Sequence, residues 1–182
     1  GVKMFLEAPR EQLQEVYVSE SFLEKCSCRE HLEEVGYEVV SDSVFSKISD
    51  TCTPQGVLCV LKQFHYNIEE MLRDKAPLFL LLENIQDPGN LGTMLRTGEG
   101  AGVSGIITVD LYNPKVIRST MGSIYRVPFY YADDFAAAVH QVQQAGVSVY
   151  AAHLRGKNSY ACQDYTKGTA FLIGNEGNGL RE

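Results

Sequence analysis

The sequence predicts an α/β fold, with a small N-terminal α/β unit followed by a larger α/β unit whose sheet is mostly parallel. Strand-like and helix-like apolar runs alternate along the chain, which is the pattern of α/β proteins. Residues 78–83 (LFLLLE) are almost continuously apolar, as in a parallel strand covered on both faces. The 182 residues, 45% of them hydrophobic, are typical of a globular protein of one or two domains and exclude a disordered chain.

The first third alternates short elements. A helix over residues 22–35 follows Ser21, a suitable N-cap, and ends at Gly36. A helix over residues 2–8 ends before Pro9. The remaining elements expected here are strands at 13–18, 37–40 and 56–61 and a short helix at 43–49.

The second half is more regular. A loop with Asp-Pro-Gly follows the strand at 78–83, and a helix follows that loop at 91–100. A short helix at 113–119 is entered through Asn113-Pro114, and Asp133 caps a helix that reaches residue 145. The expected strands are 105–109, 128–131, 147–153 and 169–173. We therefore divide the chain into an N-terminal unit at 1–63, a linker at 64–76 and a second unit at 77–182.

The charge argues mildly against nucleic acid as a partner. The chain has 16 basic and 23 acidic side chains and a net charge of −7. Residues 1–63 hold 6 basic and 11 acidic side chains, whereas residues 64–182 hold 10 and 12. Only local basic clusters in the second half could meet phosphate.

The cysteines favour a reducing, cytoplasmic location. There are five, an odd number, and only Cys26 and Cys28 are close in sequence. No spacing of cysteine and histidine predicts a metal site, so we expect none. No apolar run reaches the ~18 residues of a membrane span. Residue 1 is Gly rather than Met, so we expect the chain to begin inside a longer gene product.

One nucleotide-like motif is misleading. Gly100, Gly102 and Gly105 spell G-x-G-x-x-G, but a dinucleotide-binding loop needs a strand before it and a helix after it. Here the order of expected elements is reversed, so we interpret the first two glycines as helix terminators.

Two loops at the ends of apolar strands are better candidates. Residues 84–97 (NIQDPGNLGTMLRT) follow the first buried strand, and Asn90 with Arg96 at a helix start would suit a phosphate or carboxylate. The alternative is that Asn90 is only an N-cap and Arg96 a solvated charge. Residues 174–180 (GNEGNGL) follow the last strand, and their glycines would let backbone approach a ligand. A plain flexible loop is the alternative there.

Taken together, the motifs resemble the SpoU (TrmH-like) branch of the SPOUT RNA methyltransferases. The first loop resembles N-x-x-D-P-x-N-x-G-T-x-x-R-T, and residues 119–123 with Pro128 resemble the family's second, serine- and glycine-containing motif. The last loop resembles G-N-E-G-x-G-L. The resemblance covers residues 78–182. A weaker one links residues 53–57 to a small substrate-binding domain that often precedes the catalytic domain and is related to kink-turn-binding ribosomal proteins.

The resemblance implies methyl transfer from S-adenosyl-L-methionine to a ribose 2′-OH of structured RNA, and it favours ribosomal over transfer RNA. By the same resemblance, Arg96 would activate the hydroxyl or contact the RNA phosphate, with Asn90 and Glu176 completing the catalytic set. The residues implied in cofactor binding are Gly174, Asn175, Glu176, Gly177 and Leu154. Those implied in RNA contact are Arg96, Arg118 and Ser123.

The resemblance also implies a homodimer, which would gather basic side chains in one groove. Family members continue past the third motif with a strand, a loop and a helix that thread a trefoil knot. This chain stops at Glu182, so we expect either that the tail exists beyond it or that the product is truncated. Two other classes stay open: a non-catalytic RNA-binding protein with a degenerate methyltransferase fold, and an unrelated small-molecule enzyme. Retention of Asn90, Arg96 and Glu176 together argues against the first.

Overall fold

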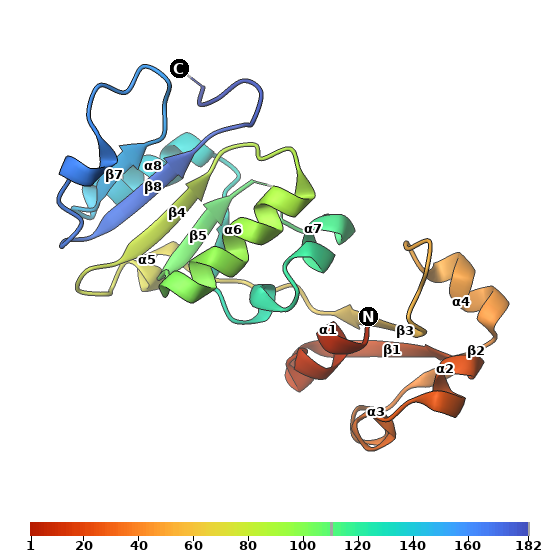
Figure 1. Cartoon of the computed structure of the whole chain (residues 1–182). Helices are drawn as coiled ribbons and strands as arrows, with labels where there is room; N and C mark the ends of the chain where they lie inside the picture. The colour runs from red at the N-terminus through yellow and green to blue at the C-terminus, as the bar shows by residue number, and fades with distance from the viewer. Residues whose placement is uncertain (110, 182) are drawn as a thin grey trace. The chain divides into compact units, whose positions relative to one another are not determined.

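A computed structural model describes residues 1–109 and 111–181 (Figure 1). The chain forms two compact units, Gly1–Phe64 and His65–Glu182, each with its own sheet. The division lies one residue after the end proposed from the sequence for the N-terminal unit.

The first unit is a three-stranded sheet in the order β2-β1-β3. Strand β1 (Leu13–Ser19) pairs in parallel with β2 (Glu38–Val40) and antiparallel with β3 (Val57–Leu61). Its core contains Phe5 from α1 (Val2–Glu7) and Leu32. The short helix expected at 43–49 is α4 (Asp42–Ile48).

The single helix expected over residues 22–35 is wrong, because the structure has two. Helix α2 (Glu20–Lys25) is capped by Ser19, whose Oγ accepts a hydrogen bond from the Phe22 amide at 3.2 Å, and α3 (Arg29–Val35) follows a break. Cys26 and Cys28 both pack against the core of this unit. Residues two apart point to different sides of a helix, so a continuous helix could not bury both.

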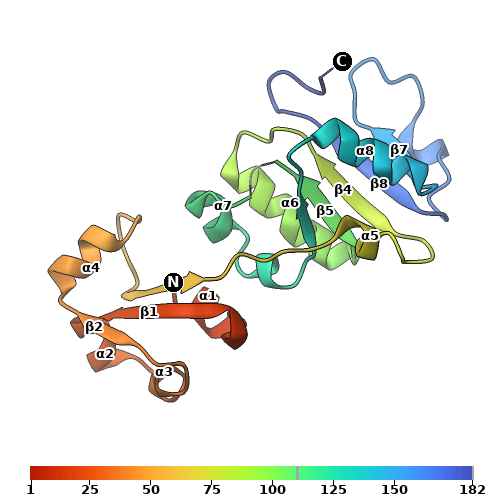
Figure 2. The same cartoon turned by 180° about the vertical axis from the view of Figure 1, so that it is seen from behind.

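The second unit has a five-stranded, wholly parallel sheet in the order β6-β5-β4-β8-β7. The strands are β4 (Leu78–Leu82), β5 (Gly105–Thr108), β6 (Phe129–Tyr131), β7 (Ser148–Ala151) and β8 (Thr169–Ile173). Helices α6 (Pro88–Ala101) and α7 (Pro114–Ser119) lie on one face, and α5 (Ile68–Met71) and α8 (Phe135–Gln144) lie on the other (Figures 1 and 2). The predicted α/β class with a mostly parallel sheet is confirmed.

Two local expectations need correction. The segment interpreted as a linker contains α5, whose Ile68 and Met71 are buried in the core of the second unit with Phe79 and Leu81. Helix α8 is capped by Asp134, whose Oδ1 accepts a hydrogen bond from the Ala137 amide at 3.0 Å, and not by its neighbour Asp133.

The misleading glycine motif has the predicted order of a helix and then a strand, but Gly100 lies within α6 and does not end it. Gly102 ends α6 in the left-handed region, with φ 69°, and β5 then begins at Gly105. In the part of the chain that the structure describes, no helix has the length and apolar character needed to span a membrane.

Candidate functional site

The parallel sheet brings the first and third motif loops together. Strands β4 and β8 are neighbours, with Leu82 in register with Ile173, so the loops after them leave the same edge of the sheet. The carboxyl edge of an open parallel sheet is where such folds bind ligands. The sequence places these loops about 90 residues apart, and the sheet order makes them one surface.

Glu176 joins the two loops. Its carboxylate accepts hydrogen bonds from the amides of Gln86 (2.8 Å) and Asp87 (3.2 Å) and from Nδ2 of Asn90 (3.0 Å). These bonds stabilise the charged form, with the Asn90 side chain contributing most, and they lower the pKa of Glu176 to about 2. Glu176 therefore acts as an anionic clamp between the third motif and the first.

This clamp changes the interpretation of the first motif. Helix α6 begins at Pro88, and its N-cap is Asp87, whose Oδ1 accepts from the Asn90 amide at 2.9 Å. The amides of Gln86 and Asp87, just before the helix, are already bound to Glu176. The simple N-cap interpretation of Asn90 is thus wrong. The carboxylate at this helix start comes from the protein itself.

The third motif forms a tight hairpin. Asn175 and Gly179 exchange two backbone hydrogen bonds, and Oδ1 of Asn175 accepts from the amides of Gly177 and Asn178, both at 2.9 Å. Nδ2 of Asn175 donates to the carbonyl of Asn84 at 2.8 Å, which adds a second link to the first motif. The amides of residues 175, 177, 178 and 179 are therefore already bonded within the hairpin.

Gly174 is required by close packing inside that hairpin. A Cβ on residue 174 would lie 2.5 Å from the carbonyl carbon of Gly179 and 2.5 Å from the amide nitrogen of Leu180. Both are backbone atoms and cannot step aside, so a side chain at 174 must open the loop. A ligand contact at this position depends on the loop shape that glycine allows.

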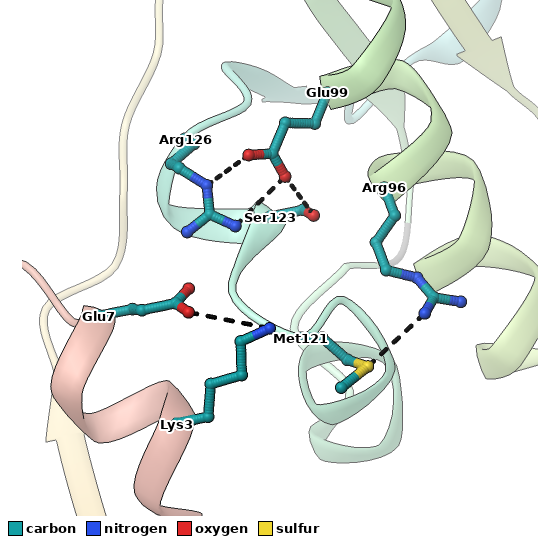
Figure 3. A network of polar contacts seen from close by, with 7 residues as sticks. All are labelled: Lys3, Glu7, Arg96, Glu99, Met121, Ser123 and Arg126. Atoms are coloured by element: carbon teal, nitrogen blue, oxygen red, sulfur yellow. Dashed lines mark hydrogen bonds and ion pairs between the residues drawn. The ribbon is translucent and has the colours of Figure 1, made fainter.

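Arg96 lies on the exposed side of α6 and is not part of the clamp. Its Nη2 donates to Oγ1 of Thr93 at 3.0 Å, and its Nη1 lies 3.5 Å from the sulfur of Met121 (Figure 3). Among the described residues, the structure thus brings Asn90 and Glu176 into contact but holds Arg96 through Thr93 and Met121. An exposed guanidinium is available to an anion.

The second motif fixes α7 against α6. A Cβ on Gly92 would lie 2.0 Å from Oγ of Ser119, so the two helices touch at a glycine. Ser119 Oγ is 2.6 Å from the carbonyl of Pro88 and 2.7 Å from that of Val116. The first residue of α6 is therefore tied to the last residue of α7.

The structure does not support RNA contact by Ser123. This residue is 2% exposed, and its hydroxyl donates to Oε2 of Glu99 at 2.6 Å. Arg126 pairs with the same carboxylate (Figure 3). Ser123 therefore holds the segment after α7 against α6. Arg118, in the last turn of α7, is exposed.

Two further features lie at this edge. Leu154 is fully exposed and follows β7, the neighbour of β8. A cleft of about 250 Å³ is lined by Asn84, Ile85, Gln86, Thr108 and Val109 at the ends of β4 and β5. Asn84, Ile85 and Gln86 belong to the first motif loop, whereas the sequence predicts no role for Thr108 and Val109.

Comparison with known proteins identifies the family. Residues 77–182 match the family model described as SpoU rRNA Methylase. The chain belongs to this family. The match covers more than half of the chain and contains all three motif loops, so the resemblance seen in the sequence is confirmed.

Relatives and solved structures agree with this assignment. The chain is 34% identical over 146 residues to the 23S rRNA (guanosine(2553)-2′-O)-methyltransferase RlmP of Bacillus subtilis, covering 78% of this chain and 56% of that protein. It is 41% identical over 88 residues to the human mitochondrial rRNA methyltransferase 3, covering 44% of this chain and 21% of that protein. The chain thus spans about half or less of the length of these curated relatives.

Two crystal structures share the whole fold. The AdoMet-bound rRNA methyltransferase of Sinorhizobium meliloti is 29% identical, with a TM-score of 0.81, covering 100% of this chain and 71% of that one. The SpoU methyltransferase AviRb of Streptomyces viridochromogenes has a TM-score of 0.82 at 21% identity, covering 100% and 72%, and is evidence for the fold alone.

Proposed function

We propose that this SpoU family protein transfers a methyl group from S-adenosyl-L-methionine to a ribose 2′-OH of ribosomal RNA. The observation that carries the proposal is the bond between Asn90 and Glu176, which unites the first and third family motifs in one site. The relatives named as 23S rRNA 2′-O-methyltransferases support the reaction and the RNA class.

The third-motif hairpin is the proposed cofactor site. The residues present fit the group: Gly177 and Gly179 are exposed, and beyond its chain neighbours no atom of the described residues lies within 4 Å of a Cβ built on Gly179, so a flat ring could approach the backbone. The backbone carbonyl oxygens of the hairpin would accept hydrogen bonds from the N–H groups of the adenine amine. The bound cofactor supplies an electrophilic methyl group on a positively charged sulfur. Gly174 and Asn175 would keep the hairpin in shape, and Leu154 would contact the cofactor from the β7 side.

Arg96 is the proposed catalytic residue. A 2′-OH is a poor nucleophile, so its proton must leave as the methyl group arrives. A guanidinium is effectively always protonated and therefore a poor base, but it stabilises negative charge on the ribose oxygen or binds the adjacent phosphate. Its exposure makes both roles accessible to an RNA. Asn90 and Glu176 would act indirectly, by fixing the loop from which α6 starts.

The wider assembly follows from the family assignment. We propose that the N-terminal unit takes part in holding RNA, that Arg118 contacts it, and that a homodimer gathers the basic side chains that one acidic chain lacks. We also propose that the knotted segment of the family completes the cofactor site, and that the protein works in the cytoplasm. The five free cysteines are compatible with a reducing compartment.

The decisive experiment maps 2′-O-methylated nucleotides in total RNA from cells with and without the gene. Loss of methylation at a ribosomal nucleotide, restored by the wild-type gene and not by an Arg96→Ala variant, supports the proposal. Unchanged methylation, combined with RNA binding by the purified protein, would favour the non-catalytic alternative.

A further inference from the structure

The segment between α7 and β6 is fastened along α6 at two successive turns. Arg96 and Glu99 are three residues apart on α6 and are therefore neighbours on its surface. Met121 reaches Arg96, and Ser123 with Arg126 reaches Glu99 (Figure 3). The Glu99 contacts are the stronger pair, because they join a carboxylate to a guanidinium and to a hydroxyl.

Met121 has an unusual backbone. Its φ is 51°, in the left-handed region that residues other than Gly, Asn and Asp rarely occupy, and Gly122 follows with φ 100°. Thr120, directly before it, is fully buried, and its Oγ1 donates to the carbonyl of Ile117 at 2.7 Å. A methionine held in a disfavoured conformation between fixed neighbours costs free energy that the surroundings must supply.

The left-handed conformation of Met121 places its sulfur beside Arg96. Although Met121 is 47% exposed, its sulfur lies 3.5 Å from Nη1 of Arg96. The other end of the same guanidinium is held by Thr93 at 3.0 Å. Thioether sulfur is a weak acceptor, and a charged donor strengthens such a contact. The guanidinium is thus held at both Nη atoms, while its charge still faces solvent.

We propose that Met121 is a positioning residue for Arg96: its sulfur, presented by the left-handed turn and anchored through Glu99, limits the rotation of the guanidinium and holds it in the orientation used on the ribose. This inference rests on the proposed function of Arg96. It accounts for a strained, half-exposed methionine where glycine or asparagine would fit the backbone better.

Two substitutions separate positioning from folding. Met121→Leu keeps the bulk of the side chain and removes the sulfur. Met121→Gly removes the sulfur and also relieves the strain of the positive φ, so the stability of this second variant should be kept or increased. Each should lower the single-turnover rate of methyl transfer to ribosomal RNA by about three- to tenfold, as expected for loss of one weak orienting contact. Cofactor affinity and RNA affinity should stay unchanged. Met94→Leu, a methionine on α6 without this contact, is the matched control.

A double-mutant cycle tests whether the effect passes through Arg96. In an Arg96→Ala background, Met121→Leu should have no further effect on the rate. If the two effects multiply instead, Met121 acts independently of Arg96 and the proposal is overturned. A normal rate for both Met121 variants would overturn it equally.

A measurement without turnover keeps the inference separate from the proposed function. Nuclear magnetic resonance of the Arg96 guanidinium in the full-length protein should show faster rotation about Nε–Cζ in Met121→Leu than in the wild type, with no change in Met94→Leu. Unchanged rotation would refute the positioning role even if transfer is observed. Faster rotation in Met121→Leu than in a wild-type protein that transfers no methyl group would uphold the contact and refute the function.

Discussion

Nδ2 of Asn90 lies 3.0 Å from Oε1 of Glu176, although 86 residues separate the two in the sequence. The same carboxylate also holds two backbone amides of the first motif. A hydrogen bond to a charged acceptor is about twice as strong as a neutral one. The ionised Glu176 side chain therefore strengthens the connection between the two family motifs, which the bond from Asn175 to the Asn84 carbonyl also makes.

The first prediction concerns the pH dependence of stability. The pKa of Glu176 is about 2 in the folded protein, below its ordinary value of 4.5, so its contribution is full above about pH 4.5 and is lost as the pH falls through 2. Glu176→Gln should therefore lower the free energy of unfolding by about 0.5–1 kcal/mol at pH 7, a modest effect because the site is exposed. Thermal unfolding of the wild type and the variant from pH 7 to pH 2 should show the two curves converging.

Asp133→Asn is the control for this series, because Asp133 is exposed and is not the cap of α8. The difference in free energy of unfolding between Asp133→Asn and the wild type should not change with pH in the way expected for Glu176→Gln. A constant gap between the wild type and Glu176→Gln down to pH 2 would show that the clamp does not depend on the carboxylate charge.

The second prediction concerns the contact of α6 with α7. Gly92→Ala would place a methyl group 2.0 Å from Oγ and 2.6 Å from the carbonyl carbon of Ser119, so the helices must separate. We expect a loss of about 1–3 kcal/mol in the free energy of unfolding, measured with denaturant. Gly100→Ala on the same helix would meet no atom of the described residues within 4 Å outside the helix's own backbone, and it should stabilise the protein by about 0.5–1 kcal/mol. Equal effects of the two variants would contradict the packing argument.

The third prediction concerns the cofactor. Gly174→Val forces the hairpin open against backbone atoms of Gly179 and Leu180. Calorimetry on the full-length protein should show S-adenosyl-L-methionine affinity reduced on the order of tenfold or more, which is about 1.4 kcal/mol. Asn178→Ala, which leaves the backbone bond of residue 178 to Asn175 intact, should change the affinity little. Normal affinity in Gly174→Val would place the cofactor elsewhere.

Much of the second unit could be predicted from sequence because its signals are local. The continuous apolar run of β4, the Asn113 cap of α7 and the glycine that ends α6 each act within a few residues. The break between α2 and α3 could not be predicted, because Cys26 and Cys28 turn toward a core that exists only once the sheet has formed. The burial of Ile68 and Met71 in the second core is non-local in the same way.

In the candidate site, too, local motifs could be predicted from the sequence and the contacts between them could not. The family motifs identify Asn90, Arg96 and Glu176, but no sequence pattern tells which of them touch. The sheet order decides that Asn90 meets Glu176, and the turn after α7 decides that Arg96 meets Met121. Ser123 was misassigned because a serine in a motif has the same signature whether its hydroxyl faces RNA or, as here, Glu99.

The last prediction concerns Arg96. If the Arg96 guanidinium acts on the ribose oxygen or on the adjacent phosphate, it contributes more to stabilising the transition state than to binding the cofactor. Arg96→Ala should then lower single-turnover methyl transfer by roughly 10²–10⁴-fold, with cofactor affinity nearly unchanged. Arg73→Ala, which removes an exposed charge between α5 and β4, is the control and should leave the rate near normal.

Arg96→Lys keeps the charge but loses the planar fork that Thr93 and Met121 hold. Substantial rescue by lysine would indicate a simple phosphate contact, and no rescue would indicate an oriented, bidentate or proton-handling role. Near-normal transfer by Arg96→Ala would make this arginine a surface residue and remove it from the mechanism.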